Sequence, residues 1–103
     1  MVTHTLIFSF PAEMSEAHRE QFFREGSAIA IGSGLVESYR HERHIPLAND
    51  ENSPVFVASA LARVSHADVD TMRKYVEYPP VREFVRRWQA RFPYQVVWVN
   101  TED

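Results

Sequence analysis

Two side chains in this sequence could take part in proton transfer, His4 and Tyr75. His4 lies on the apolar side of an alternating run, and its imidazole titrates near neutral pH. It could therefore act as a general base or anchor a ligand, or it could be a buried neutral histidine bonded to a backbone or tyrosine partner. Tyr75 could orient a ligand carbonyl or phenol through its hydroxyl, or it could be a core aromatic with its hydroxyl at the surface.

The other histidines point to no metal site. His41 and His44 are three apart on a predicted strand, so they should face opposite sides of the sheet, and no third ligand lies near them in sequence. His18 and His66 are expected in the first turns of helices, exposed to solvent. The chain has no cysteine, no glycine-rich phosphate loop and no His-Glu-x-x-His motif, so we expect no metal and no cofactor.

Composition places further limits on function. The 103 residues should form one domain, 1–103, and 45% hydrophobic with 24% charged residues is ordinary for a globular protein. The formal net charge of −3 argues against a nucleic-acid partner, which would require a basic surplus. No apolar run is long enough to span a membrane, and no signal-like segment begins the chain, so we expect no membrane contact and a cytoplasmic location.

The elements that position His4 and Tyr75 follow from periodicity. Alternation predicts strands at residues 2–10, 35–44, 55–64 and 94–99, with a polar loop at 46–54 and a tail from Asn100. Ser15 is a suitable N-cap for a helix at 16–31, which Gly32 and Gly34 should end. A capping box at Ser65-x-x-Asp68 should start the next helical region.

That second helical region is broken by two prolines. Apolar residues recur at helical spacing before Pro79 and again after Pro80, and each proline disfavours the α conformation of the residue before it. The first helix should end near Tyr78, and a proline can open the second helix without losing a hydrogen bond. We expect a bent double helix across a sheet, with Tyr75, Tyr78 and Val81 at a hollow beside the bend.

The order β-α-β-β-α-β predicts a ferredoxin-like α+β sandwich, in which an antiparallel four-stranded sheet carries its helices on one face. The opposite face would expose Ile7, Val97 and Val99, which is too much apolar surface to leave in water. We therefore predict a homodimer that pairs these faces.

Four segments together resemble the stress-responsive A/B barrel (Dabb) family. They are the strand at residues 4–10, the helix with Phe22-Phe23, the Gly34-Leu35-Val36 turn, and Tyr75-x-x-Tyr78-Pro79-x-Val81, and they span nearly the whole chain. The resemblance implies a dimeric α+β barrel. Characterised relatives of this family include a plant polyketide cyclase and, more distantly, cofactor-free monooxygenases that act on aromatic substrates.

The chain departs from that family where the cyclase carries its proton-transfer groups. The family segment reads Tyr-x-x-His-Pro-x-His, so Tyr75 and Pro79 match, as does His4 on the first strand. Tyr78 and Val81 stand where the family has histidines. The tyrosine that the cyclase carries on its first helix falls at Gly26 here. Since valine cannot carry a proton, efficient cyclase chemistry is not expected.

We expect a small, mainly apolar pocket between helices and sheet. The residues predicted to line it, besides His4 and Tyr75, are Leu6, Phe8, Phe22, Phe23, Val81, Phe84, Trp88 and Trp98. Such a pocket suits a small aromatic or polyketide-like ligand. Two alternatives remain: a cofactor-independent cyclase or monooxygenase using His4 and Tyr75, and a structural dimer whose own side chains fill the pocket.

Overall fold

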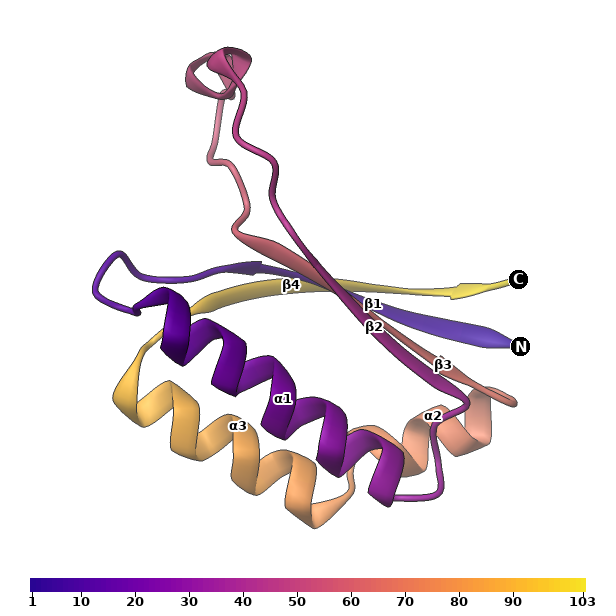
Figure 1. Cartoon of the computed structure of the whole chain (residues 1–103). Helices are drawn as coiled ribbons and strands as arrows, with labels where there is room; N and C mark the ends of the chain where they lie inside the picture. The colour runs from indigo at the N-terminus through magenta and orange to yellow at the C-terminus, as the bar shows by residue number, and fades with distance from the viewer.

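A computed structural model describes residues 1–103 of the chain. In chain order, the elements are β1 (Val2–Ser9), α1 (Glu16–Gly32), β2 (Ser38–Arg43), a 3-10 helix (Ala48–Asn52), β3 (Ala60–His66), α2 (Val69–Val76), α3 (Pro79–Arg91) and β4 (Gln95–Glu102). The sheet order is β2-β3-β1-β4 with every neighbouring pair antiparallel. The three α-helices cover one face of the sheet (Figure 1). The predicted ferredoxin-like α+β fold is confirmed.

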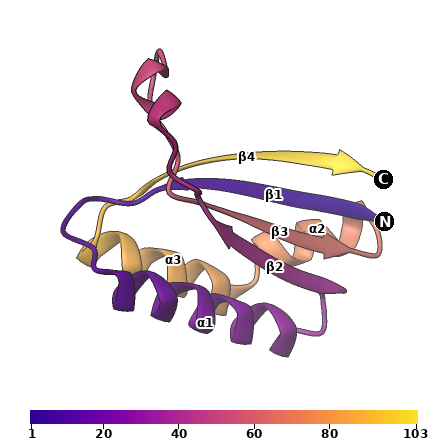
Figure 2. The same cartoon turned by 45° about the horizontal axis from the view of Figure 1, so that its top comes forward.

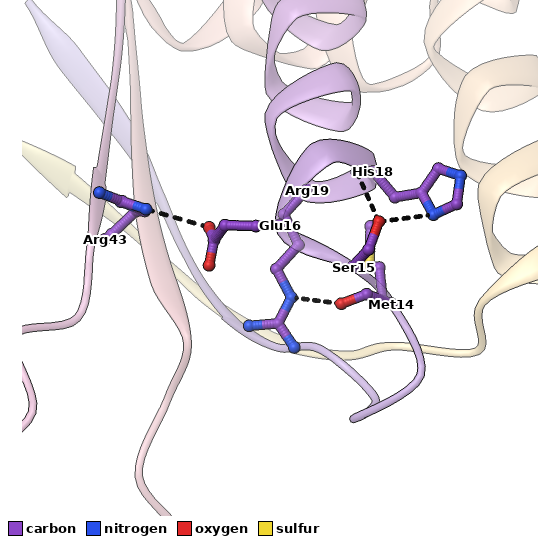
Figure 3. Close-up of polar contacts among 6 residues, drawn as sticks. All are labelled: Met14, Ser15, Glu16, His18, Arg19 and Arg43. Carbon is purple, nitrogen blue, oxygen red and sulfur yellow. Dashed lines mark hydrogen bonds and ion pairs between the residues drawn. The ribbon is translucent and has the colours of Figure 1, made fainter.

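The start of α1 is fixed by hydrogen bonds to its first turn (Figure 3). The Ser15 hydroxyl accepts from the backbone N–H of His18 at 3.2 Å, as expected of an N-cap. The Arg19 side chain donates to the Met14 carbonyl at 2.9 Å. These contacts hold α1 at a defined position against the loop that follows β1.

The break between α2 and α3 lies at the paired prolines, as predicted. Helix α2 ends at Val76, Tyr78 has an extended backbone (φ −64°, ψ 123°), and Pro79 begins α3. An extended residue before a proline is the conformation that the proline ring favours. The resulting bend places Tyr75 and Val81 beside the sheet, on either side of the joint.

The predicted capping box at Ser65 is wrong. The strand β3 runs on to His66, and Ser65 pairs with Thr3 across the sheet, so it cannot cap a helix. The N-cap of α2 is Asp68, whose carboxylate accepts from the Thr71 backbone N–H at 2.8 Å. Ser65 is still part of β3, whereas Asp68 lies after the end of the strand and can therefore cap the helix that follows.

Three strand boundaries also differ from expectation. β2 begins at Ser38 rather than at residue 35. β3 begins at Ala60, which pairs with Phe8 and Arg43, rather than at residue 55. At the other end of the chain, the expected tail continues β4 to Glu102 because Asn100 and Glu102 pair with β1. Cross-strand partners, which alternation cannot reveal, set these limits.

Residues 44–59 form an arm that leaves the sheet on the side away from the helices (Figures 1 and 2). A 3-10 helix lies at its tip, within the segment predicted to be a polar loop. The His44 and Asp50 side chains meet at 2.8 Å. At the base of the arm, Arg43 donates to Glu16 of α1 at 3.1 Å (Figure 3). Four apolar side chains of the arm are exposed: Ile45, Leu47, Val55 and Phe56.

The core lies between the helices and the sheet and is rich in aromatic rings. The buried rings include Phe8, Phe10, Phe22, Phe23, Phe84, Trp88 and Tyr94. Phe22 of α1 is central, since it packs with centroid separations of 5.0–5.5 Å on rings from β1, from α3, and from the residues that directly follow β1 and precede β4. Such edge-to-face contacts add to the free energy gained by burial.

Replacing Phe22 with alanine will lower the free energy of unfolding by about 3–5 kcal/mol, because a cavity would open among these rings. Urea denaturation at one fixed protein concentration measures the change. Val69→Ala on α2 is the control, since Val69 is 54% exposed and its loss should change stability by about 0.5 kcal/mol or less. A loss below about 1 kcal/mol for Phe22→Ala would contradict the assignment of Phe22 to the core.

No helix covers the opposite face of the sheet. Ile7 pairs with Leu61 on one side and Val97 on the other, and Val97 and Val99 are 54% and 52% exposed. The chain exposes 6685 Å², whereas a monomeric protein of 12.0 kDa typically exposes about 6000 Å². No helix combines the length and the apolar character needed to cross a membrane.

Candidate functional site

A cavity of about 390 Å³ lies between the helix-covered face of the sheet and the helices. Most of its wall is apolar. It includes eight of the residues predicted from sequence: His4, Leu6, Phe8, Phe22, Tyr75, Val81, Phe84 and Trp98. The structure therefore brings His4 of β1 and Tyr75 of α2 to the wall of one cavity.

Phe23 and Trp88, also predicted to line the pocket, pack behind this wall. Phe23 is buried and stacks on the His41 ring at 4.5 Å between centroids. Trp88 is 2% exposed, and its indole N–H donates to Glu25 at 3.2 Å. Helical spacing identifies the face that is buried, but it does not distinguish residues at a cavity wall from residues in the packed core.

The orientation of His4 is fixed by a neighbour on β4. His4 and Asn100 are paired across the sheet, and His4 Nδ1 lies 2.6 Å from Asn100 Oδ1. An amide oxygen can only accept, so Nδ1 carries the proton and Nε2 keeps its lone pair. His4 therefore presents an unprotonated nitrogen that could accept a proton from a ligand.

Burial lowers the pKa of His4 below its ordinary value of 6.5, although the hydrogen bond to Asn100 opposes this effect. The positive charge that His66 would carry when protonated also lowers the pKa of His4. His4 is 8% exposed, so a charged imidazolium would be poorly solvated there. His4 is therefore neutral, and competent as a base, at pH 7.

His66 is fully buried, which corrects the expectation of a solvated helical residue. It is the last residue of β3, and its Nδ1 donates to the Leu35 carbonyl at 2.8 Å. Its Nε2 has no hydrogen-bond partner. The His66 ring lies 5.1 Å from the Tyr75 ring, so it forms part of the packing that holds Tyr75.

Tyr75 supplies a hydrogen-bond donor to the cavity. Burial raises the pKa of its phenol to about 12, so the hydroxyl keeps its proton throughout the physiological range. The hydroxyl makes no hydrogen bond within the chain. His4 and Tyr75 thus offer a proton acceptor and a proton-bearing donor in mainly apolar surroundings, which is suited to deprotonating a carbonyl compound.

The sequence prediction lacks nine of the 17 lining residues, and four of these bear on the chemistry or shape of the cavity: Gly26, Tyr39, Tyr94 and Asn100. The polar composition of β2 gives no sign of a cavity residue, although the alternation of Tyr39 with His41 and Arg43 is consistent with the helix side of the sheet. Asn100 lies in the segment predicted to be a tail, but it pairs with His4 in β4. Trp98 lies 6.1 Å from His4 between ring centroids and is 60% exposed, so it marks the open side of the cavity.

No cluster of three or more histidine, cysteine, aspartate or glutamate side chains is arranged to hold a metal ion. His41 stacks on Phe23, and His44 contacts Asp50, so the two histidines are engaged separately.

No protein-family model and no curated protein matches this chain. Among solved structures, the Arabidopsis thaliana protein At3g17210 is similar with a TM-score of 0.83 and 13% identity, over 100% of this chain and 95% of that one. Hydroxynitrile lyase from Passiflora edulis has a TM-score of 0.79 and 12% identity, over 97% of this chain and 90% of that one.

A Dabb family protein with a ferredoxin-like fold from Mesorhizobium loti has a TM-score of 0.75 and 19% identity, over 99% of this chain and 95% of that one. Ferredoxin-like proteins from Bacteroides fragilis and Thermobifida fusca, with TM-scores of 0.68 and 0.75, are dimeric. At such identities the likeness establishes the fold alone: this chain has the ferredoxin-like fold of that Dabb family protein over nearly its full length.

Proposed function

We propose that this chain is a dimeric protein of the Dabb type that binds a small aromatic or polyketide-like carbonyl compound and deprotonates it weakly through His4. The observation that carries the proposal is the 2.6 Å contact between His4 Nδ1 and Asn100, which leaves His4 Nε2 free at the wall of an apolar cavity. His66 also has an Nε2 without a partner, but it does not line the cavity, so His4 is the histidine that can offer a lone pair to a ligand there.

The cavity supports a ligand of this class by size and chemistry. Its volume of about 390 Å³ lies at the lower end of the range for small-molecule sites, and aromatic side chains form much of its wall. An aromatic ring would be stabilised by burial there. The same volume argues against the alternative in which the protein's own side chains fill the pocket.

The residues on the wall support one reaction step. His4 Nε2 accepts the proton from the carbon next to the ligand carbonyl, and the electron pair of that C–H bond moves toward the carbonyl oxygen. The Tyr75 hydroxyl donates to the resulting enolate oxygen, and Asn100 stabilises the imidazolium through its bond to Nδ1. The hydrogen on Nε2 exchanges with water, and reversal of the step then returns a solvent proton to the carbon.

The cavity has no second histidine to continue the reaction. Val81 lies on the wall where a second proton carrier would be needed for cyclisation, and a valine side chain cannot supply a proton. We therefore expect binding and enolisation without efficient polyketide cyclisation. The hydroxynitrile lyase among the structural neighbours supports the view that this fold can carry enzymatic chemistry.

The dimeric part of the proposal depends on the uncovered sheet face. Ile7, Leu61 and Val97 lie side by side on it, and the arm of residues 44–59 adds further exposed apolar side chains on the same side. The excess exposed surface, about 700 Å², is close to the roughly 800 Å² that one partner buries in a standard interface. The two dimeric structural neighbours support the same assembly.

The rate of enolisation should depend on pH through His4. Protonated His4 cannot accept a proton, so the protein-dependent rate should fall as the pH falls through its pKa. Because burial lowers that pKa, the half-maximal rate should lie below pH 6.5 and the rate should be level from pH 7 to pH 8. Acetophenone with a trideuterated methyl group, incubated in water and analysed by mass spectrometry for deuterium loss, provides the measurement.

A half-maximal rate above pH 6.5 would contradict the assignment of His4 as a buried base. A protein-dependent rate no faster than that of buffer would remove the catalytic part of the proposal. Failure to bind acetophenone or its hydroxylated derivatives would remove the whole of it.

A further inference from the structure

Tyr39 makes a polar contribution to the cavity that packing does not explain. Five of the six residues of β2 are exposed, and Tyr39 is the exception. Its side chain lies on the helix side of the sheet, at the cavity wall, and its hydroxyl makes no hydrogen bond within the chain. The hydroxyl is not fully buried, since His66 Nε2 is the one buried side-chain polar atom without a partner, so Tyr39 presents an accessible donor where phenylalanine would present none.

Gly26 of α1 provides the space for this hydroxyl. A Cβ atom at residue 26 would lie 3.3 Å from the Tyr39 hydroxyl oxygen and 3.2 Å from Cζ of Phe84, closer than ordinary van der Waals contact. The backbone at Gly26 does not require glycine, because Gly34 alone has a positive φ. Glycine in the middle of a helix is unfavourable, so its presence here is explained by the room it leaves for the Phe84 ring and the Tyr39 hydroxyl.

The sheet register places Tyr39 at a defined distance from His4. Tyr39 pairs with Val64 of β3, Val64 pairs with His4 of β1, and His4 pairs with Asn100 of β4, so the four residues form one row across the sheet. Strands lie about 4.8 Å apart, so the backbones of Tyr39 and His4 are separated by roughly 10 Å. A flat molecule lying over Val64 would have His4 at one end and Tyr39 at the other.

Both phenols keep their protons at neutral pH. Burial raises the pKa of Tyr39 above the usual range of a phenol, and the neighbouring Tyr75 and Tyr94 act in the same direction. Tyr39 is therefore a donor, and the complementary group on a ligand is an acceptor oxygen. Tyr75 already offers a donor to the carbonyl next to His4, so the Tyr39 donor suits a second oxygen.

We propose that Tyr39 and Gly26 form a second polar subsite, which binds a phenol or carbonyl oxygen at the end of the ligand remote from His4. This inference rests on the proposed function and narrows the ligand class to planar aromatic carbonyl compounds with an oxygen at each end. Hydroxyaryl ketones are the simplest members of that class. The space beside Gly26 then limits the size and position of the ligand oxygen that can reach the Tyr39 hydroxyl.

The test compares acetophenone with 3- and 4-hydroxyacetophenone, titrated into the full chain and followed by backbone amide chemical shifts in NMR. The unmodified protein should bind the better of the two hydroxylated probes about 3- to 10-fold more tightly than acetophenone, the effect of one hydrogen bond. Tyr39→Phe should abolish that preference and leave acetophenone binding unchanged. Tyr75→Phe should weaken all three probes.

Two further variants test whether the preference depends on the Tyr39 hydroxyl itself. Tyr78→Phe removes a hydroxyl at the α2–α3 joint, away from the cavity wall, and should change no affinity. Gly26→Ala favours the helix but crowds the Tyr39 hydroxyl, so it should reduce the preference without loss of folding. Tyr39→Phe with an intact preference would overturn the subsite.

The outcomes separate this inference from the proposed function. Tight binding of acetophenone without any preference for the hydroxylated probes would overturn the subsite and leave the His4 site standing. Failure of all three probes to bind would overturn both.

Discussion

Replacing His4 with glutamine will slow the protein-dependent loss of deuterium from acetophenone by roughly 10²–10⁴-fold, the usual contribution of a well-placed general base. Glutamine keeps a polar side chain that can donate to Asn100, but it cannot accept a proton from carbon at neutral pH. The affinity for acetophenone should change by less than about 3-fold, because most of the cavity wall is apolar and unchanged. His4→Gln should therefore lower the rate of deuterium loss and leave the affinity for acetophenone nearly unchanged.

His18→Gln is the matched control, since His18 lies in the first turn of α1 and bonds to Ser15 outside the cavity. Its rate should equal that of the unmodified protein. Asn100→Leu should lower the rate by a smaller factor, on the order of 10-fold, because Nδ1 then loses the acceptor that fixes the tautomer and stabilises the imidazolium. If His4→Gln retained more than a third of the rate, His4 would not be the base.

Much of the fold could be predicted because its signals are local. Alternation around Leu6 and Phe8 defines β1, Ser15 marks the start of α1, and Pro79 separates α2 from α3. Each of these signals acts through the backbone of neighbouring residues. The chain order of the elements then leaves few topologies, and the observed order β2-β3-β1-β4 is the ferredoxin-like one.

The site could be predicted only in part because it depends on pairing across the sheet. His4 and Tyr75 are recognisable by type, but the partner of His4 is Asn100, which no local pattern connects with it. Tyr39 enters the same row through Val64 on β3, and only the register shows this. The prediction of His66 in a helical turn is wrong for a related reason, since β3 continues to His66, beyond the strand end predicted at residue 64.

Placing an aspartate at residue 7 will dissociate the proposed dimer. Ile7 lies between Leu61 and Val97 near the middle of the uncovered sheet face, so in a dimer a carboxylate there would be buried without a partner. Such a charge costs several kcal/mol, so the dissociation constant should rise by roughly 10³-fold or more. Sedimentation velocity at micromolar concentration should show a dimer for the unmodified chain and a monomer for Ile7→Asp.

Ala17→Asp adds the same charge in the first turn of α1, where the side chain is exposed on the helix side of the molecule, and it should remain dimeric. Within one protomer Ile7 lies on the open face, away from the aromatic core, so Ile7→Asp should keep its helical circular dichroism. A folded Ile7→Asp protein that sediments as a dimer would place the interface elsewhere, and an unmodified chain that sediments as a monomer would remove the dimer altogether. A charge at the exposed Phe56 of the arm should weaken the dimer by a smaller factor, since the arm leaves the sheet on the side of the uncovered face.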